Sequence, residues 1–477
     1  MESAHTIAPE LTAAPLHAAL REQRAAYLAA PFPSLDERRA DLKQLLRMLQ
    51  ENREAIIAAI SADYGHRSRH ETMLAEIAPM VSTIGHVRRH LKSWMRPQRR
   101  AIDRLTYGLA SNRVIPQPLG VIGVIVPWNF PLFLSFGPLI SIFAAGNRAM
   151  VKMSESSRHL ARLLIAIAPA YFPPEKLQFF DETGGVGIEF SKLKFDHLFF
   201  TGSGATGRAV MTAAAANLCP VTLELGGKCP AIVGADFDIR LASERISFVK
   251  YLNAGQICTT VDHVYVPEGS VEPFIESVRA AVRRRYTALD CKDYTSIVEL
   301  NAYRRVKAAL EEAAARGAKV MPLLDGPAFD DAAHRLAPHL VTGAPTDCEL
   351  MQREIFGPVL PVVPYRDLDG VIARINAGPR PLAVYPFSND RRVVDTIIER
   401  VMSGGVTVND ALMHVAQDDM PFGGVGESGM GHYHGREGFL AFSKLRPVFH
   451  QARWSSTKLL EPPYGKLAER ILAFLAR

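Results

Sequence analysis

The sequence lacks a long basic tract, and its charges almost balance. Over 477 residues, 55 Lys and Arg stand against 49 Asp and Glu, which gives a net charge of +6 at pH 7. Nucleic-acid binding needs a clustered basic surface, so this composition argues against it. Apolar residues make up 48% and charged residues 22% of the chain, a balance typical of soluble globular proteins. The length is sufficient for two or three domains around a large core.

Cysteine is also scarce. The chain has five cysteines and no Cys-x-x-Cys pair, and an odd number cannot all be bridged. They are Cys219, Cys229, Cys258, Cys291 and Cys348. This usage fits a reducing compartment in which thiols are either buried or chemically used. Residues 1–15 lack the basic segment and apolar core of a signal peptide, so we expect a cytoplasmic protein. No metal site is expected.

Charge is absent from residues 120–147, which contain no Asp, Glu, Lys or Arg. An apolar run of roughly 20 residues suffices to span a bilayer. Pro127 and Pro131, however, remove two backbone donors and would break a helix there. The sequence therefore predicts no membrane span, but a buried strand over 121–126 that ends in a rigid turn. Such turns carry ligand contacts in open α/β sheets, so Asn129 either directs its amide at a ligand or bonds to its own turn.

The remaining pattern is one of alternating strands and helices, without an internal repeat. Leucines and isoleucines at steps of three and four predict one amphipathic helix over 36–63. Short β-branched runs then alternate with helical stretches, which favours a parallel sheet covered by helices on both faces, the usual nucleotide-binding layout. The expected strands are 121–127, 148–153, 197–203 and 230–236, and the expected helices are 156–172 and 204–218.

A second α/β series follows residue 225. Its expected strands are 262–268, 361–366 and 405–410, and its expected helices are 271–286 and 301–320. Residues 104–118 and 443–454 are predicted to be extended strands outside both cores. We therefore expect two α/β domains joined by a small β element. The predicted ranges are 1–100 and 116–223 for a cofactor-binding domain, 224–420 for a catalytic domain, and 101–115 with 440–456 for a bridging and oligomerisation element.

A glycine-rich turn follows the predicted strand at 197–203. Gly202, Gly204 and Gly207 satisfy G-x-G-x-x-G before a helix, the setting in which the motif binds a phosphate at a helix N-terminus. The pattern alone is weak, because glycine-rich turns are common. The dinucleotide fingerprint also expects an acidic residue about 20 positions further on for the ribose. Glu224 occupies that place, although a second interpretation of it remains open.

That second interpretation starts from Cys258. A lone cysteine is more often a small buried apolar residue than a nucleophile, but Cys258 is flanked by small and polar residues in NAGQICTT, 253–260. The stretch LELGG, 223–227, places a carboxylate before two glycines that let the backbone pass close to a ligand. Glu224 could therefore serve as the base for a Cys258 thiol.

Seven short motifs are spread along nearly the whole chain. They occur in the same order as in a known protein family. They are PWNFP (127–131), VKMSE (151–155), FTGSGATGR (200–208), LELGGK (223–228), GQICTT (255–260), EIFGPV (354–359) and PFGGVGESGMG (421–431). With these motifs the sequence resembles the aldehyde dehydrogenase family. The ending SGMGHYHGREGF resembles the class 3-like branch, and within it the coniferyl aldehyde dehydrogenases. The resemblance implies a Rossmann-like cofactor domain, an α/β catalytic domain and a bridging β element.

The resemblance also implies a mechanism. Cys258 would attack the aldehyde carbon as a thiolate, and the Asn129 side chain with the Cys258 N–H would bind the oxyanion. After hydride transfer to the nicotinamide, Glu224 would activate the water that hydrolyses the thioester. An aromatic aldehyde is expected as substrate. A CoA-acylating enzyme is an alternative, against which Glu224 argues, and a non-catalytic structural protein is another, against which all three residues argue.

The cofactor implied by the resemblance is NAD, with NADP as an alternative. The residues that match the family's cofactor contacts are Lys152 and Glu155 for the adenosine ribose, Gly202, Ser203 and Gly207 at the pyrophosphate, Glu354 for the nicotinamide ribose, and Phe356 and Trp128 at the nicotinamide. Without the resemblance, Lys152 and Glu155 would be an ordinary surface pair three residues apart. The family further implies a homodimer, and the amphipathic segment 466–477 is expected to pack on the body or on the partner subunit.

Overall fold

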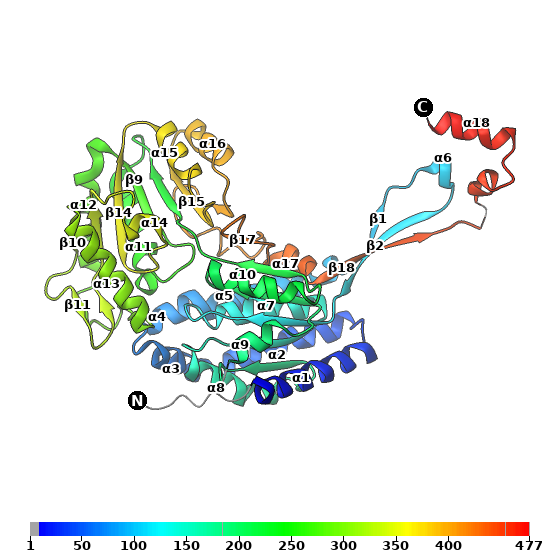
Figure 1. Ribbon diagram of the computed structural model, residues 1–477, viewed down its shortest axis with the longest axis horizontal. Coiled ribbons are helices and arrows are strands. Elements are labelled where there is room, and N and C mark those ends of the chain that lie inside the picture. The colour runs from blue at the N-terminus through cyan, green and yellow to red at the C-terminus, as the bar shows by residue number, and fades with distance from the viewer. Residues whose placement is uncertain (1–8, 184, 454, 477) are drawn as a thin grey trace.

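The computed structural model describes residues 9–183, 185–453 and 455–476, and its first layer is a six-stranded sheet (Figure 1). The strand order is β17-β7-β6-β3-β4-β5, parallel except for β17. The bounds are β3 Val121–Ile125, β4 Arg148–Lys152, β5 Leu177–Phe180, β6 His197–Thr201, β7 Val221–Glu224 and β17 Gly429–Met430. The expected strands at 121, 148 and 197 are found here, whereas the fourth, expected at 230–236, is β8 Pro230–Val233 of the second sheet, so its place in the first series is wrong.

Helices cover both faces of this sheet, as the alternation predicted. On one face lie α1 Pro9–Ala29, α9 Val186–Ser191 and α10 Gly204–Ala215. The other face carries α2 Leu35–Glu51, α3 Arg53–Tyr64, α5 Ala78–Trp94, α7 Phe133–Ala145, α8 Arg158–Ile167 and α17 Gly435–Ala441. Between α3 and α5 run the short helix α4 Arg69–Thr72 and the π-helical turn η1 Met73–Ile77, and 3₁₀ turn η2 Ala168–Ala170 follows α8.

The second layer is a seven-stranded sheet in the order β10-β13-β14-β9-β8-β15-β16, parallel except for β10. Its strands are β8 Pro230–Val233, β9 His263–Pro267, β10 Lys319–Pro322, β13 His339–Thr342, β14 Val359–Tyr365, β15 Ala383–Phe387 and β16 Gly405–Val406. Its helices are α11 Ile239–Tyr251, α12 Val271–Arg285, α13 Leu300–Ala315, α14 Glu349–Gln352, α15 Leu368–Asn376 and α16 Arg391–Arg400. The smaller elements η3 Leu252–Gly255, η4 Glu268–Ser270, β11 Phe329–Asp330 and β12 Arg335–Leu336 complete it.

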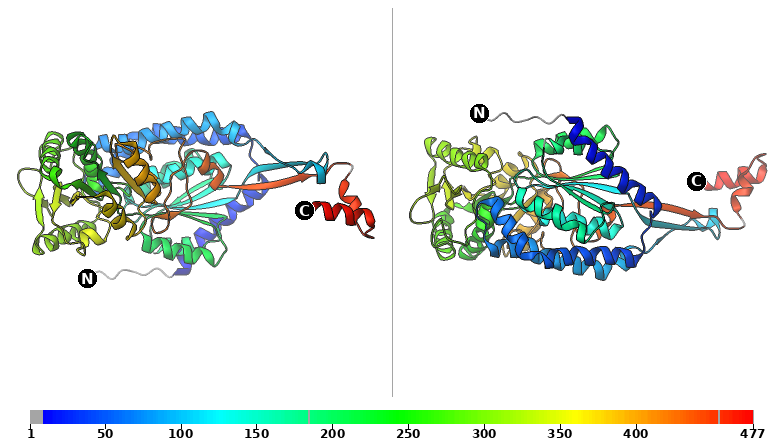
Figure 2. Two further views of the ribbon diagram at one scale, coloured as in Figure 1. Left: turned by 90° about the horizontal axis from the view of Figure 1, so that it is seen from above. Right: turned by 90° about the horizontal axis from the view of Figure 1, so that it is seen from below.

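A three-stranded antiparallel arm extends away from the two layers (Figures 1 and 2). It consists of β1 Gln98–Arg100, β2 Ser111–Pro118 and β18 Ser443–His450, with α6 Arg104–Tyr107, η5 Ser456–Leu460 and α18 Lys466–Leu475 toward its far end. The expectation of an unbroken strand over 104–118 is wrong in its first part, because residues 104–107 form the helix α6. The strands reach from residue 98 to 118, beyond the predicted bridging range of 101–115.

The single helix expected over 36–63 is also wrong, since α2 and α3 are separated at Asn52. Asn52 has φ −109° and ψ 14°, outside the helical region. Its side-chain amide donates to the Met48 carbonyl at 2.8 Å and to the Tyr171 hydroxyl at 2.9 Å. Asparagine side chains compete with the helix for backbone groups in this way, and the apolar spacing around Asn52 does not reveal it.

The uncharged stretch 120–147 resolves into β3, a turn and the helix α7, whose residues from Leu134 onward are all buried. It is therefore internal to the fold. Among the described residues, no helix has both the length and the apolar character that a bilayer crossing needs. The expectation about a signal peptide concerns residues 1–15, of which 1–8 lie outside the described residues.

Candidate active site

The turn after β3 carries Asn129, which is 4% exposed. Its side-chain amide donates to the carbonyl of Gln256 at 3.2 Å. The amide is thus directed across to another segment rather than at its own turn. Because Gln256 lies two residues before Cys258, the predicted oxyanion residue and the predicted nucleophile are neighbours in space.

Cys258 follows η3, where the backbone takes an unusual path. Asn253, Ala254 and Gly255 have φ of 52°, 50° and 73°, a left-handed conformation that non-glycine residues seldom adopt. A Cβ at Gly255 would overlap the carbonyl oxygen of Gly357, so the position requires glycine. Cys258 follows this tightly packed loop, and its side chain is half-buried.

The surroundings of the Cys258 thiol favour its protonated form. Burial raises its pKa to about 12, and the nearby carboxylates of Glu354 and Glu224 raise it in the same direction. A thiolate nucleophile therefore needs a base to remove the proton. The two carboxyl groups that influence the thiol are the candidates for that base.

Glu224 is the last residue of β7 and is 2% exposed. Neither of its carboxylate oxygens has a hydrogen-bond partner among the described residues. Burial raises its pKa well above the usual value for Glu, which makes it a stronger base than an exposed carboxylate. A buried carboxylate without partners is costly, and such groups are typical of functional sites.

Glu354 lies against the two glycines of the LELGGK motif. A Cβ at Gly226 would overlap its carboxylate, so the first glycine makes room for this side chain. Burial raises the pKa of Glu354 to about 8, and a hydrogen bond from the Gly227 backbone partly offsets this. One carboxylate oxygen, Oε1, is buried and has no hydrogen-bond partner within residues 9–183, 185–453 and 455–476. A ligand hydroxyl, such as that of a ribose, would supply the missing donor.

The predicted nicotinamide contacts lie beside one another. The rings of Trp128 and Phe356 meet edge to face, with centroids 5.4 Å apart and planes at 88°. Trp128 precedes Asn129, and Phe356 lies two residues after Glu354, so the two aromatic residues connect the oxyanion turn with the Glu354 loop. Phe356 has φ 50°, a strained value for an aromatic residue.

Lys152 ends β4 and is 6% exposed, which is incompatible with an ordinary surface pair. Its ammonium lies 3.8 Å from the exposed carboxylate of Glu155 and forms a closer ion pair with Glu182. Glu182 was missed by the sequence analysis. The strand pattern could have indicated Glu182 as a neighbour of Lys152. Glu182 follows β5, the parallel neighbour of β4, and the carboxyl ends of neighbouring parallel strands lie at one edge of a sheet.

The glycine-rich turn leads into α10 as predicted. Ser203 is the N-cap, and its hydroxyl accepts a hydrogen bond from the Thr206 N–H at 3.2 Å. Gly207 packs so closely on Leu225 that a Cβ would approach it to 2.8 Å. Gly202 is similarly tight against the Phe200 ring. The free N–H groups at the start of α10 suit a phosphate.

Tyr433 is a second residue that the sequence analysis missed. It is fully buried, its hydroxyl has no partner among the described residues, and burial raises its pKa well above the usual value for Tyr. It comes from the loop before α17, within GHYHG, and no local pattern marks it. Within the described ranges, no three His, Cys, Asp or Glu side chains are grouped so that they could hold a metal ion.

The geometry thus brings Asn129, Cys258, Glu224 and Glu354 together, and Lys152 with Glu155 in a separate ion-pair group. The catalytic and cofactor-binding roles of the individual residues stay predictions.

Comparisons with known proteins agree with this architecture. The model of the aldehyde dehydrogenase family matches residues 3–448. A Pseudomonas aeruginosa protein named as a probable coniferyl aldehyde dehydrogenase is 47% identical over 96% of this chain and 95% of its own length. The coniferyl aldehyde dehydrogenase of a Pseudomonas species is 42% identical over 96% of each chain.

Solved structures give the same result for the fold. The substrate-bound state of Staphylococcus aureus AldH has a TM-score of 0.91 at 32% identity and covers 96% of this chain and 99% of its own. A Mycobacterium tuberculosis aldehyde dehydrogenase complexed with NAD+ has a TM-score of 0.81 at 25% identity, with 92% and 90% covered. The expected fold and the expected NAD(P)-dependent aldehyde dehydrogenase activity are confirmed at the level of the family. The chain belongs to the aldehyde dehydrogenase family.

Proposed function

We propose that the protein oxidises an aromatic aldehyde of the coniferyl aldehyde type to its carboxylic acid through a thioester on Cys258. The observation that carries this mechanism is the grouping of Cys258 with the Asn129 amide and with Glu224, whose two buried carboxylate oxygens have no hydrogen-bond partner in the described part of the chain. The substrate class is supported by the names of relatives that are 42–47% identical.

The first half of the reaction forms the carbon–sulfur bond. Glu224 takes the proton from the Cys258 thiol, and the thiolate attacks the aldehyde carbon. The carbonyl oxygen becomes an oxyanion, which the Asn129 amide stabilises by a hydrogen bond once the aldehyde displaces its bond to Gln256. NAD bound at this site would supply the acceptor for the hydride of the former aldehyde carbon, and the oxyanion held by Asn129 would then collapse to the thioester.

The second half releases the acid. Glu224 first releases to solvent the proton that it took from Cys258, then removes a proton from water, and the hydroxide attacks the thioester carbon. The carbon–sulfur bond breaks, the thiolate leaves, and the carboxylic acid departs. The presence of Glu224 favours water over a CoA thiol as the acyl acceptor, since a thiol needs no such base beside the thioester. The same grouping argues against a purely structural protein on this fold.

The proposed NAD contacts use donors and acceptors that the protein leaves available. Glu354 Oε1 is a buried acceptor to which no described residue donates a hydrogen bond, and it is suited to a ribose hydroxyl. The α10 N-terminus at Ser203 suits the pyrophosphate. At the adenosine ribose, Glu155 and Glu182 together outnumber the single cation Lys152, and this negative balance favours a 2′-hydroxyl over a 2′-phosphate.

We further propose that the arm makes a homodimer. In the order β1-β2-β18, the strand β18 is an eight-residue edge, and an exposed edge of this length is suited to pair with a second chain. The five cysteines are all free thiols, which supports a reducing compartment, the cytoplasm. The predicted domain ranges are retained as part of this proposal.

The decisive experiment is a comparison of kcat/KM for a cinnamaldehyde-type, a benzaldehyde-type and a medium-chain aliphatic aldehyde, each with NAD and with or without CoA. We expect the first to be the best substrate and the product to be the free acid in both conditions. A requirement for CoA would refute the hydrolytic mechanism. Equal or better activity with the aliphatic aldehyde would refute the aromatic substrate class.

A further inference from the structure

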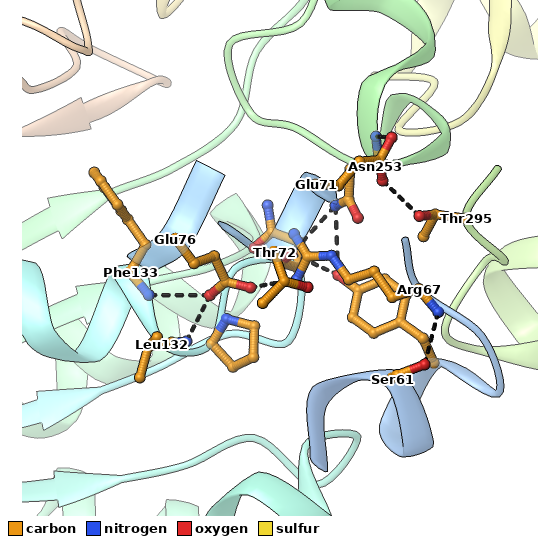
Figure 3. Close-up of polar contacts among 12 residues, drawn as sticks. Ser61, Arg67, Glu71, Thr72, Glu76, Leu132, Phe133, Asn253 and Thr295 are labelled. Carbon is orange, nitrogen blue, oxygen red and sulfur yellow. Dashed lines mark hydrogen bonds and ion pairs between the residues drawn. The ribbon is translucent and has the colours of Figure 1, made fainter. Parts of the chain in front are cut away.

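Three buried charged residues lie next to the segments that carry Asn129 and Cys258. They have no role in the reaction steps proposed above. They are Arg67, Glu71 and Glu76 (Figure 3). Arg67 and Glu76 form an ion pair in which both side chains are fully buried, and Glu71 is 7% exposed. A buried ion pair often adds no stability over apolar residues of the same size. The contacts of the three side chains show what else they do.

Glu76 holds the chain just after the Asn129 turn. Its Oε2 accepts hydrogen bonds from the N–H groups of Leu132 at 2.8 Å and Phe133 at 3.0 Å. These donors stand at the start of α7, where helix N–H groups have no partner within the helix. A carboxylate is favourable at that end of a helix, so Glu76 fixes the position at which the turn passes into α7.

Arg67 also contacts the turn that carries Asn129. Its guanidinium lies over the ring of Phe130 at 4.9 Å and over the ring of Tyr64 at 4.8 Å. The Tyr64 hydroxyl in turn donates to the carbonyl of Asn129 at 2.5 Å. Asn129 is therefore held by the residue after it, by its own carbonyl, and by the start of α7.

Asn253 connects this turn to the loop of Cys258. Its side-chain amide lies 3.2 Å from the Asn129 carbonyl and 3.2 Å from the Gln256 carbonyl. The latter is the same oxygen that accepts from the Asn129 side chain. One amide thus bridges the oxyanion residue and the segment that leads to the nucleophile.

Glu71 fixes Asn253. One of its oxygens accepts from the Asn253 N–H at 3.1 Å, and the other accepts from the Thr295 hydroxyl at 2.5 Å. Asn253 needs such support, because its φ of 52° is unfavourable for a non-glycine residue.

Glu71 and Glu76 come from one short piece of chain that includes the π-helical turn η1. Residues five apart point about 140° away from each other round a regular α-helix. A π turn is closed by bonds between residues five apart and brings such pairs toward the same side. Both carboxylates can therefore face the Arg67 guanidinium, whose charge acts on both. Interruptions of this kind are frequent at functional sites.

We propose that Arg67, Glu71 and Glu76 are positioning residues for aldehyde oxidation, which hold the Asn129 amide at a fixed place relative to Cys258. Glu76 and Arg67 act on the oxyanion turn, and Glu71 acts on the nucleophile loop. The inference rests on the proposed role of Cys258 and Asn129. It gives a function to three buried charged residues that contact neither substrate nor cofactor in the proposed mechanism.

The test uses the full-length double variant Arg67→Met/Glu76→Gln, because removal of both partners of the ion pair leaves neither of them as an unpaired buried charge. Stopped-flow mixing with saturating NAD and cinnamaldehyde measures the rate constant of the NADH burst. We expect it to fall about 10- to 100-fold, the effect of a misplacement near 1 Å. The NAD Kd and the rate of Cys258 alkylation by iodoacetamide are expected to change less than about twofold. The matched control is Arg69→Met/Glu54→Gln, which removes an exposed ion pair from the same segment.

A double-mutant cycle with Asn129→Ala separates positioning from general destabilisation. If the three residues act through Asn129, the same double substitution slows the burst of the Asn129→Ala enzyme less than about threefold. A burst as fast as that of the control variant would overturn the proposal, and so would an undiminished effect in the Asn129→Ala background. Should the double variant not fold, Glu71→Gln, which keeps the shape but only one of the two acceptor oxygens, takes its place in the same cycle.

If the proposed aldehyde oxidation through Cys258 is itself wrong, the experiments give a different result. If Cys258→Ala still reduces NAD in the presence of the aldehyde, the proposed function is wrong. If wild-type enzyme shows the burst, Cys258→Ala does not, and the positioning variants equal the wild type, only the present inference is wrong.

Discussion

Replacement of Glu224 by Gln decides between the two interpretations of this residue. The amide has nearly the same shape, and neither carboxylate oxygen has a hydrogen bond to lose among the described residues. The substitution is therefore expected to leave the fold intact. It removes the capacity to accept a proton from water, on which the proposed thioester hydrolysis depends.

The size of the effect follows from this role. Loss of a general base slows the assisted step by about 10²–10⁴-fold, which corresponds to roughly 3–5 kcal/mol of activation free energy. With excess aldehyde, stopped-flow mixing should show a burst near one NADH per active site, followed by very slow turnover. The burst is expected to be slower than in the wild type, because Glu224 also takes the Cys258 proton in the proposed mechanism.

The pH dependence gives a second readout. Burial raises the pKa of Glu224 well above its usual value, so the base form becomes populated only as the pH rises through this higher pKa. Single-turnover hydrolysis of the acyl-enzyme should accelerate over that interval in the wild type and stay flat in Glu224→Gln.

The contribution of Glu224 to the free energy of unfolding should fall with rising pH, whereas the rate of acyl-enzyme hydrolysis should increase. The folded protein holds the Glu224 proton at pH values where the unfolded chain has lost it, so this group lowers the free energy of unfolding as the pH rises from the unfolded to the folded pKa. Glu224→Gln removes that dependence, and its Tm relative to wild type should increase with pH across this interval. A raised NAD Kd with otherwise normal turnover would refute the reasoning and restore Glu224 as a ribose ligand.

Three further predictions follow from the site and the arm. Cys258→Ala should abolish aldehyde oxidation and keep the NAD Kd measured by fluorescence titration, whereas Ala at each of the other four cysteines should keep activity; retained activity of Cys258→Ala would end the thiol mechanism. Wild-type enzyme should prefer NAD in kcat/KM, and Glu155→Gln should shift the ratio toward NADP by about fivefold, the effect of one exposed charge at close range; a clear NADP preference of the wild type contradicts this. Light scattering at micromolar concentration should give the mass of a dimer, and a stable monomer would exclude pairing through β18.

Elements set by short-range patterns could be predicted from the sequence. The strand β3 and the turn after it follow from an apolar run that Pro127 and Pro131 interrupt. The N-cap at Ser203 follows from the glycine-rich turn before α10. In each case the residues that determine the structure lie within a few positions of one another, where backbone preferences decide the outcome.

Long-range partners could not be predicted in this way. The break at Asn52 involves a contact with Tyr171, 119 residues away. Glu71 and Asn253 are separated by 182 residues. Glu182 reaches Lys152 only because β4 and β5 are neighbours in the sheet. Apolar periodicity reports which face of an element is buried, but not which polar side chains meet there.

At the LELGGK motif the structure shows a close approach different from the one that the sequence indicated. Its two glycines indicated a close approach of the backbone to a ligand, yet in the structure a Cβ at Gly226 would overlap the carboxylate of Glu354. The glycine therefore makes room for another side chain of the site. Among the residues that the structure describes, none donates a hydrogen bond to Oε1 of that side chain, and the side-chain oxygens of Glu224 and Tyr433 also have no partner. Unpaired buried polar atoms are unfavourable for folding, and three such residues in one place are accounted for if substrate, cofactor and water supply the missing partners during the reaction. No sequence pattern contains this signal, because it arises only when segments from the two large sheets and the loop before α17 come together.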